Sequence, residues 1–551
     1  MHDPVARHVG STLATRRRAT SETDWTWWRD GVLYQIYPRS FADSNGDGIG
    51  DLPGITAHLD YLEWLGVDAI WLSPISASPN DDWGYDVADY CSVDPDLGTL
   101  ADADRLMEEA ASRGIRVMLD LVPNHTSDRH PWFVDARSSR RSRYRDFYVW
   151  ADPGPGGGPP NNWVNAFGPS RPAWTLDPTS GQYYLHHFLP SQPDLNWWND
   201  GVREAFDQVL RFWFDRGVAG FRIDVCSQIV KDRELRDNPP AGPGDHPVIR
   251  RAGQRPIYNS YRPELHQVLR RWRAIADSYH VRRALLGETA VFDPQQLASF
   301  YGQGDELHLA YNFMLQRAPF ALPELCQVVE RTEAALPATG WPVWAAGSHD
   351  ISRYPTRWAE GDAAKTRCIM VMLAGLRGTP LLYYGEELGM PDTAVPHDRV
   401  RDRGRQSMGG TGRDPARTPM PWEPVPGAGF TAPGVEPWLP LGDMTACNVA
   451  DQVDDPSSIL SLTRDVVRLR ARLPSLRRGS YRTHPGSEGE LWAWWRGDDV
   501  IVALNLSDAR ASVPGVQGAV LLCTDRSRDG ERVEAVLELA PREAAIVGLE
   551  V

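Results

Sequence analysis

The sequence predicts an α/β protein built on a (β/α)₈ barrel, with a subdomain inserted after the third strand and a C-terminal antiparallel β-sandwich. Three observations lead to this prediction. Short apolar runs alternate with amphipathic segments from about residue 32 to 470. A long stretch rich in Gly, Pro, Trp and Asn interrupts this alternation. After residue 478 the pattern changes to closely spaced runs that are typical of antiparallel strands.

Eight apolar runs are typical of buried parallel strands, because both faces of such a strand are apolar. Amphipathic segments such as 100–113 and 202–216 lie between them and are predicted to be helices. Eight strand–helix units indicate a closed TIM barrel. The predicted strands are residues 32–37, 68–73, 115–120, 220–225, 284–288, 307–312, 342–347 and 379–384.

The barrel is predicted to cover residues 25–125 and 197–475. The first interruption, 126–196, contains PGPGGGPPNNW and is too long for a simple loop, so it is predicted to form a subdomain beside the mouth of the barrel. A second stretch, about 391–438, is predicted to be a long loop over the same face. Residues 476–551, with runs such as VIVALNL, are predicted to form the C-terminal β-domain.

The formal net charge of −15 argues against nucleic acids and anionic membranes as partners, because both would repel the chain. No apolar run is long enough for a membrane span. Residues 1–24 contain basic residues but no apolar core, which predicts a disordered N-terminal segment and not a secretion signal. The six cysteines form no CxxC pair, which favours free thiols and a cytoplasmic location. Composition does not separate a monomer from a homodimer.

Acidic residues stand at the carboxyl ends of predicted barrel strands, where the catalytic face of such a barrel lies. Asp224 occurs in GFRIDV, Glu288 in LLGET and Asp350 in GSHD. Hydrolysis of a glycoside with retention of configuration needs a nucleophile and an acid/base whose carboxyl groups are roughly 5–5.5 Å apart. Asp224 is predicted to be the nucleophile and Glu288 the acid/base. Arg222, on the same side of the strand as Asp224, is predicted to keep it ionised.

Asp350, His349 and His125 are predicted to hydrogen-bond the sugar hydroxyls at the cleaved residue. Each of these residues alone could equally be a structural polar group at a barrel end. Their occurrence together, in order and on the predicted strands, favours the catalytic interpretation.

These segments resemble the four sequence regions of the α-amylase superfamily of retaining glycosidases, glycoside hydrolase family 13. The resemblance covers nearly the whole chain from Trp27 on. Within that superfamily, GVLYQIYPRSFADSNGDGIGDLPGI, QPDLNWWN and RDPARTPMPW are similar to the α-glucosidase and oligo-1,6-glucosidase branch. The resemblance implies that Asp224 is the nucleophile, Glu288 the acid/base and Asp350 the transition-state stabiliser.

The resemblance also implies a closed pocket for a terminal glucose. Asp82, in DDWGYD, matches a residue that binds the outer hydroxyls, and Tyr85 matches one that stacks under the ring. Arg417, in ARTPMPW, matches the arginine that pairs with that aspartate. Such a pair offers acceptors and donors to O4 and O6 and closes the pocket, so exo action is expected. The alternative is a surface ion pair of little energetic value.

Two further positions bear on specificity. Val225 follows Asp224; in the family, Val there tends to accompany α-1,6 cleavage, although core packing would explain this side chain equally well. The Lys-His pair usual in endo-acting amylases is missing after Val225, which favours short sugars. Ser348 stands where the family commonly has Asn, and its effect on acceptor preference is open.

Residues that can supply an oxygen ligand recur at every second position of DSNGDGIGD, as in an EF-hand loop with Gly48 at the sharp turn. The oxygen comes from a side chain at each of these positions except Ile49, where it is the backbone carbonyl. Gly54 stands where such a loop has its bidentate Glu. The segment resembles the calcium loop of this glucosidase branch, so a structural Ca²⁺ is expected, in preference to Mg²⁺, which tends to keep its waters. The alternative is an Asx-rich turn without an ion. The predicted ligands are Asp43, Asn45, Asp47, the Ile49 carbonyl and Asp51.

The sequence therefore predicts a retaining, exo-acting α-glucosidase of short α-glucosides, of the maltose or isomaltose type, with a covalent glucosyl-enzyme intermediate and no organic cofactor. One alternative is an isomerase or transglucosylase, such as a trehalose or isomaltulose synthase, which would use the same Asp224 and Glu288 but re-add the released glucose. A second is a binding protein that has kept the barrel. The intact Asp224, Glu288 and Asp350 argue against it.

Overall fold

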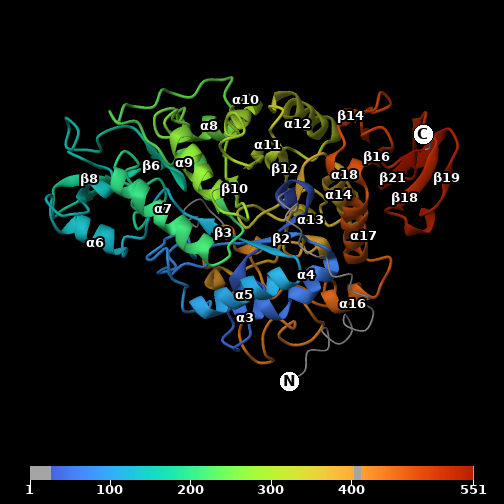
Figure 1. The fold of residues 1–551 in the computed structure, drawn as a ribbon, viewed down its shortest axis with the longest axis horizontal. Coiled ribbons are helices and arrows are strands. Elements are labelled where there is room, and N and C mark those ends of the chain that lie inside the picture. Colours follow the sequence, from blue (N-terminus) through green and yellow to red (C-terminus); the bar gives the residue numbers. More distant parts are fainter. Residues whose placement is uncertain (1–25, 403–410, 550–551) are drawn as a thin grey trace.

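The computed structural model describes residues 26–402 and 411–549. The predicted disordered N-terminal segment, 1–24, lies outside these residues, as does part of the predicted loop 391–438. Figure 1 shows a central barrel with an insertion on one side and a C-terminal β-domain on the other. The predicted fold class is confirmed by this arrangement.

The barrel consists of eight parallel strands in the closed order β1-β13-β12-β11-β10-β9-β3-β2. Each predicted strand is present, with its ends within three residues of the predicted ones. A buried apolar cluster that includes Leu33, Trp71, Met118 and Leu286 links these strands. The strands are β1 (Leu33–Ile36), β2 (Ala69–Leu72), β3 (Arg116–Leu121), β9 (Gly220–Ile223), β10 (Ala284–Gly287), β11 (Leu309–Tyr311), β12 (Pro342–Trp344) and β13 (Thr379–Tyr383).

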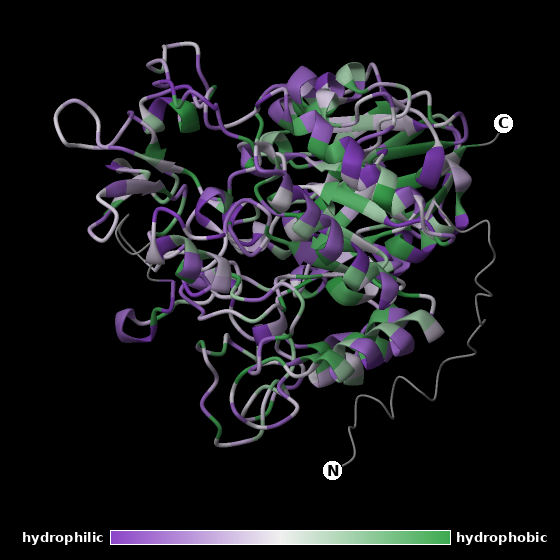
Figure 2. Ribbon diagram, turned by 60° about the vertical axis from the view of Figure 1, so that its left-hand side comes forward, coloured by the Kyte–Doolittle hydropathy of each residue, from purple (hydrophilic) through white to green (hydrophobic). Residues whose placement is uncertain are grey.

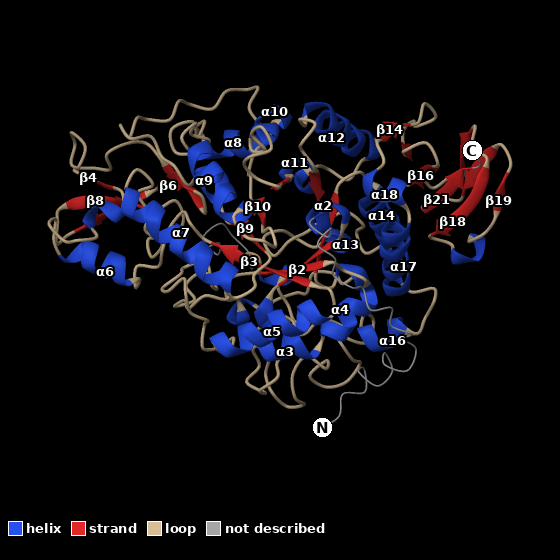
Figure 3. Cartoon of the chain, in the orientation of Figure 1, coloured by secondary structure: helices blue, strands red, loops and turns tan. Residues whose placement is uncertain are grey.

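Helices cover the outside of the barrel (Figure 3). The two predicted helices are confirmed, and their starts follow from their caps: Thr99 forms a capping box with Asp102, and the Asn199 side chain accepts the Gly201 N–H. The longer helices are α5 (Leu100–Ser112), α7 (Asp200–Asp215), α9 (Leu265–Asp277), α12 (Leu322–Ala335), α14 (Ala363–Gly375) and α17 (Ile459–Arg472). The shorter ones are α2 (Trp27–Asp30), α3 (Leu52–Ala57), α4 (Leu59–Leu65), α8 (Pro247–Ala252), α10 (Pro294–Ser299), α11 (Phe313–Arg317), α13 (Tyr354–Arg357), α16 (Val449–Val453) and α18 (Pro474–Arg478).

The segment between β3 and α7 forms the insertion, with two small antiparallel sheets ordered β4-β8-β7 and β5-β6. Trp163, Trp174 and Leu185 are buried in a core of its own. Its elements are α6 (Pro131–Ser138), the 3₁₀ turn η3 (Arg145–Phe147), β4 (Trp150–Ala151), β5 (Val164–Asn165), β6 (Gly168–Pro172), β7 (Trp174–Asp177) and β8 (Gln182–Leu185).

The C-terminal domain has a six-stranded sheet, β14-β15-β16-β21-β18-β19, and a two-stranded sheet, β17-β20. Val513 and Leu537 of the small sheet share a buried core with Ile501 and Val547 of the large one, so the two sheets form a sandwich. Figure 2 shows the apolar character of these strands in green. The strands are β14 (Tyr481–Thr483), β15 (Leu491–Arg496), β16 (Val500–Asn505), β17 (Ala511–Pro514), β18 (Gly518–Cys523), β19 (Arg532–Val533), β20 (Val536–Leu539) and β21 (Glu543–Leu549).

The large sheet of this domain also contacts the barrel through α14. Trp494 and Val502 belong to the main core of the protein and lie against Gly375 at the end of α14. The C-terminal domain is therefore fixed to the barrel by buried apolar surface and not by a linker alone.

Two chain-wide predictions concern membranes and cysteines. In residues 26–402 and 411–549, no helix is long and apolar enough to cross a membrane. All six cysteines lie in this part of the chain and are unpaired, as predicted.

Candidate active site

Two of the predicted catalytic residues, Asp224 and Glu288, lie together at the carboxyl ends of neighbouring strands. β9 lies between β3 and β10, and the registers place Arg222 opposite Asp120 and Ile223 opposite Gly287. Asp224 and Glu288, which directly follow those positions, therefore leave the barrel side by side. This proximity results from parallel pairing in register, because residues 64 positions apart in the chain are otherwise independent.

Arg222 lies at the centre of the site and is only 2% exposed. Its Nη1 donates to Asp120 Oδ1 and to Asp224 Oδ1, each at 2.8 Å, and its Nη2 lies 2.8 Å from Glu288 Oε2. The guanidinium also stacks on the Trp71 ring at 4.9 Å. Because Asp224 and Glu288 bond the same planar group, their carboxylates lie close to each other.

Burial and the charge of Arg222 shift the pKa of Asp224 in opposite directions. Burial raises the pKa of the Asp224 carboxyl well above its usual range, whereas the charge of Arg222 lowers it. A nucleophile must be ionised, so the predicted role of Arg222 is to oppose the desolvation of this carboxylate. Burial also raises the pKa of Asp120, to about 7, against the same arginine.

The turn after Asp224 has a strained backbone. Val225 has φ 46° and ψ 36°, a left-handed conformation that a β-branched residue rarely adopts. This conformation directs the Val225 N–H to Glu288 Oε2 at 2.8 Å. Glu288 Oε2 is thus held from two sides, by Val225 and by Arg222.

His349 and Tyr85 form a stacked pair beside these carboxylates, with ring centroids 5.3 Å apart and planes at 2°. Tyr85 Oη lies 2.7 Å from His349 Nε2 and donates to Asp120 at 3.0 Å, while Gln35 Nε2 lies 2.7 Å from His349 Nδ1. Burial lowers the pKa of His349 well below its usual value, so this imidazole is neutral at pH 7. The predicted residues Tyr85 and His349 are thus rigidly placed.

The predicted pairing of Asp82 with Arg417 is wrong. Arg413 makes this ion pair, with Nη2 at 2.5 Å from Asp82 Oδ1, and it also bonds Asp402 at 2.7 Å and Asp350 at 3.1 Å. Arg417 instead donates to Asp350 Oδ1 at 3.1 Å and to the His349 carbonyl at 2.8 Å. Asp350 is therefore held by two arginines, of which Arg413 also reaches Asp82.

Both arginines lie in the same RDPARTPMPW segment, separated by the 3₁₀ turn η7 (Asp414–Ala416). The sequence signal for Arg413 was its place four residues before Arg417, at the start of this segment. Asp402, its second carboxylate partner, carries no sequence signal of its own.

Gln192 makes a further contact that the sequence did not predict. Its Nε2 lies 3.1 Å from Asp82 Oδ2 and 3.2 Å from His125 Nε2. His125 is buried, which lowers its pKa to about 4. Gln192 comes from the insertion, so that subdomain contributes directly to the pocket, and QPDLN was the available signal.

The insertion is tied to the barrel by a buried ion pair next to His125. Asp194 bonds His187 at 2.6 Å and Lys231 at 2.9 Å, and Asn124 donates to it at 3.2 Å. All four side chains are buried or nearly so. Burial raises the pKa of Asp194, but the charge of Lys231 and the interactions with His187 and His125 together outweigh this effect, and the net shift is downward.

Ser348 has a local backbone role. Its hydroxyl accepts the Asp350 N–H at 3.3 Å. Ser348 therefore supports the turn that presents Asp350, as an Asx or ST turn does.

The predicted metal ligands lie in a series of Asx turns. Asp43 Oδ1 accepts the Asn45 N–H at 3.1 Å, Asn45 Oδ1 accepts the Asp47 N–H at 2.9 Å and Asp47 Oδ1 accepts the Ile49 N–H at 2.8 Å. Asp51 instead caps α3, with its carboxylate bonded to the Gly54 N–H at 2.6 Å and to Ser44.

Across the described part of the chain, no group of three or more His, Cys, Asp or Glu side chains is arranged to hold a metal ion. The donors of this loop suit Ca²⁺ in kind, because they are all oxygens. However, the Asp51 carboxylate is engaged by protein N–H and hydroxyl donors, so its ligation would compete with capping of α3.

Replacing Arg413 with methionine is expected to lower kcat/KM by about 100-fold, because it leaves Asp82 and Asp402 without their buried cation. Steady-state kinetics on a disaccharide measure this effect, and thermal unfolding checks the fold. Arg399→Met is the matched control, since Arg399 pairs with the exposed Glu436. Equal kinetics for both variants would contradict the assignment of Arg413 to the pocket.

Comparisons with known proteins agree on one family. The family model described as "Alpha amylase, catalytic domain" matches residues 35–479, and a domain of unknown function, DUF3459, matches residues 477–547. A "Probable alpha-glucosidase" of Rhizobium meliloti (strain 1021) is 44% identical over 510 residues, which cover 89% of this chain and 91% of the relative. An "Oligo-1,6-glucosidase" of Heyndrickxia coagulans is 38% identical over 535 residues, with 88% and 93% covered.

Solved structures of similar sequence share the fold. The alpha-glucosyl transfer enzyme XgtA superposes with a TM-score of 0.87 at 42% identity, covering 95% of this chain and 99% of that one. The trehalulose synthase MutB from Pseudomonas mesoacidophila MX-45 superposes with a TM-score of 0.85 at 33% identity, with the same coverage.

Proposed function

The chain belongs to the α-amylase family, in its α-glucosidase branch, and on this premise we propose that it is a retaining, exo-acting α-glucosidase of short α-glucosides. The observation that carries this function is the Arg222-centred cluster, which holds Asp224 and Glu288 close together at the mouth of the barrel. Its substrates are small sugars of the maltose and isomaltose type.

The reaction proceeds in two displacement steps. Asp224 attacks the anomeric carbon while Glu288 protonates the glycosidic oxygen, so the aglycone leaves and a covalent glucosyl-enzyme forms. Glu288, now ionised, removes a proton from water, which attacks the same carbon and releases glucose with its original configuration. Asp350, held by Arg413 and Arg417, hydrogen-bonds the ring hydroxyls as the sugar approaches the oxocarbenium ion.

The pocket is built for a chain end. Asp82 is only 5% exposed and is fixed by Arg413 and Gln192. We infer that these side chains would contact the outer hydroxyls of a terminal glucose and close that end of the pocket. Tyr85 and His349 form the adjoining wall. A sugar chain could not continue past this barrier, which supports exo action.

The test is the product profile from maltose, isomaltose, sucrose and trehalose. We expect free glucose from maltose or isomaltose, released first as the α-anomer, which proton NMR detects before mutarotation. Val225 leads us to expect isomaltose as the better substrate. Release of β-glucose would contradict retention, and binding without turnover of all four sugars would favour the binding-protein alternative.

A second candidate function is glucosyl transfer to a sugar in place of water. The likeness to the alpha-glucosyl transfer enzyme XgtA and to a trehalulose synthase favours it. Both reactions use the same covalent intermediate, so they differ only in the acceptor. In the same product assay, a new disaccharide or trisaccharide with little free glucose would identify transfer.

We also propose that the loop from Asp43 to Asp51 binds a structural Ca²⁺. The ligands would be Asp43, Asn45, Asp47, the Ile49 carbonyl and Asp51. The regular spacing of oxygen donors supports this proposal, as does the chain of Asx turns that gathers them. The ion would stabilise the loop after β1 and take no part in the chemistry.

Calcium is expected to raise the thermal unfolding midpoint of chelator-treated protein, by the equivalent of about 2.7 kcal/mol at 100 times Kd. Asp47→Asn should lose most of this gain, whereas the exposed Asp398→Asn should keep it. An unchanged midpoint with added calcium in both the parent and Asp398→Asn would argue for an ion-free Asx turn.

We also propose that the enzyme is located in the cytoplasm and that its oligomeric state is a monomer or a homodimer. The six unpaired cysteines support a reducing compartment. Light scattering of the purified protein would give the oligomeric state.

A further inference from the structure

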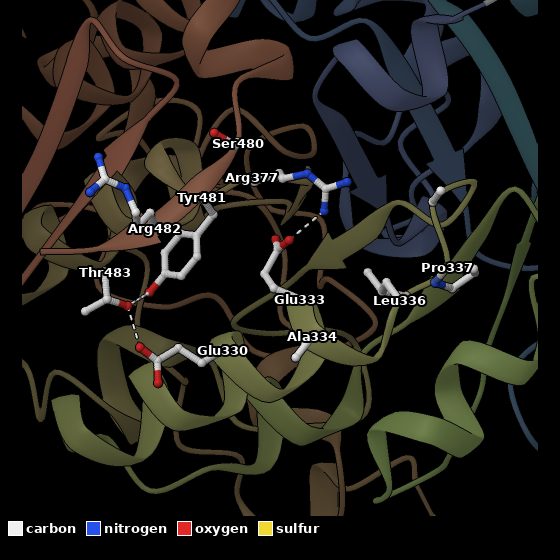
Figure 4. Close-up of a pocket in the computed structure, with 11 residues that line it drawn as sticks. Glu330, Glu333, Ala334, Leu336, Pro337, Arg377, Ser480, Tyr481, Arg482 and Thr483 are labelled. Atoms are coloured by element: carbon white, nitrogen blue, oxygen red, sulfur yellow. Dashed lines mark hydrogen bonds and ion pairs between the residues drawn. The ribbon is translucent and has the colours of Figure 1, made fainter.

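We propose that a cavity at the junction of the barrel and the C-terminal domain is a second, non-catalytic site for a neutral, hydroxyl-rich ligand such as a mono- or disaccharide. The cavity has a volume of about 550 Å³, which accommodates a sugar of this size. Figure 4 shows it between α12, the loop that follows this helix, and β14. This inference depends on the proposed function only in one respect, the choice of maltose as the sugar used to probe the cavity.

The cavity is remote from the catalytic residues. Pro337 and Ala338 precede β12, and Arg377 precedes β13, so these lining residues stand at the amino ends of the barrel strands. The catalytic carboxylates follow the carboxyl ends of their strands. The two sites therefore lie at opposite ends of the barrel, and a ligand in the cavity cannot belong to the active site.

The charges that line the cavity cancel. Glu330 and Glu333 supply two carboxylates, and Arg377 and Arg482 supply two guanidinium groups. A site with no net charge gives no advantage to an ion, whereas a neutral ligand with several hydroxyls can use both the acceptors and the donors.

Glu333 offers an acceptor that the protein uses only in part. Its Oε2 accepts a hydrogen bond from Arg377 Nη1 at 2.6 Å. A carboxylate oxygen has a second lone pair, so the same Oε2 can also accept a hydroxyl donor from a ligand in the cavity. Burial raises the pKa of Glu333, in keeping with a carboxylate that lacks full solvation.

Tyr481 supplies a rigid aromatic wall opposite Glu333 (Figure 4). Its hydroxyl accepts from Trp492 Nε1 at 3.3 Å and lies 2.9 Å from Thr483 Oγ1, which in turn donates to Glu330 at 2.5 Å. Arg377 is also fixed, because it stacks over Trp341 at 4.6 Å. A preformed ring with fixed polar groups around it is the arrangement that binds sugars at low entropic cost.

Equilibrium dialysis with radiolabelled maltose tests this site in the Asp224→Asn protein, which does not consume the sugar. We expect two molecules bound per chain at saturation. Glu333→Gln and Tyr481→Ala should each reduce this to one, while Glu324→Gln, an exposed change on the same helix, should leave two. Circular dichroism and thermal unfolding verify that each variant is folded.

Adding Arg413→Met to the Asp224→Asn protein separates the two sites, since it weakens only the pocket at the catalytic face. One molecule should then remain bound, and it should be lost with Glu333→Gln. If a single molecule binds and only Arg413→Met removes it, or if a second molecule binds regardless of Glu333 and Tyr481, the second site is refuted. A single molecule that is lost with Glu333→Gln and unaffected by Arg413→Met would support the cavity and count against the proposed active-site pocket.

Discussion

Asp224→Asn is expected to lower turnover of maltose or isomaltose by about 10⁴-fold or more, because it removes the carboxylate that we propose forms the glucosyl-enzyme. The amide is nearly isosteric with the carboxylate and keeps an acceptor for Arg222, so the fold should remain. Asp81→Asn is the matched control, since this exposed residue precedes the pocket residue Asp82. Near-normal turnover in Asp224→Asn would contradict the mechanism.

A stereochemical experiment sharpens this test. In Asp224→Ala, the space left by the side chain allows azide to attack the anomeric carbon directly. One displacement inverts the configuration, so the expected product from an activated α-glucoside is β-glucosyl azide. Formation of the α-azide would instead assign the nucleophile to another residue.

Glu288→Gln is expected to lower hydrolysis of natural disaccharides by about 10³-fold, because the leaving sugar then departs without a proton. Substrates with a good leaving group, such as p-nitrophenyl α-glucoside, need this proton less and should be cleaved with a smaller loss. Glu324→Gln, an exposed Glu outside the pocket, is the matched control. An equal loss for both kinds of substrate would indicate damage to the site and not the loss of an acid.

Azide also distinguishes the roles of the two carboxylates. In Glu288→Ala, Asp224 still forms the glucosyl-enzyme, and azide then replaces the water that Glu288 would have activated. Two displacements retain the configuration, so α-glucosyl azide is expected. Opposite anomers from Asp224→Ala and Glu288→Ala would establish the nucleophile and the acid/base independently.

The sequence predicted the barrel well because its signals are local. A run such as VMLDLV is apolar on both faces, and this property alone distinguishes a buried parallel strand from an amphipathic helix. The order of strands in a (β/α)₈ barrel follows from chain order, so the side-by-side position of Asp224 and Glu288 could also be predicted. The register that the structure shows between β9 and β10 agrees with this.

The sequence did not determine which polar groups meet across long loops. Arg413 and Arg417 are four residues apart in one motif, and each could have reached Asp82, which lies 331 positions from Arg413. The path of the loop after β13 decides between them. The same holds for Gln192, which reaches Asp82 and His125 only because the insertion folds back over the barrel.

By itself, then, the sequence determined the barrel, the insertion, the C-terminal sandwich and the strand-end positions of Asp224 and Glu288, because periodicity and strand-end position are properties of short segments. Only the tertiary structure decided that Arg413 links Asp82 to Asp350, that Asp51 caps α3 and that Glu333 and Arg377 line a cavity beside the C-terminal domain. These contacts depend on loop paths and on packing between domains, where many separate segments must fit at once and no local pattern records the result.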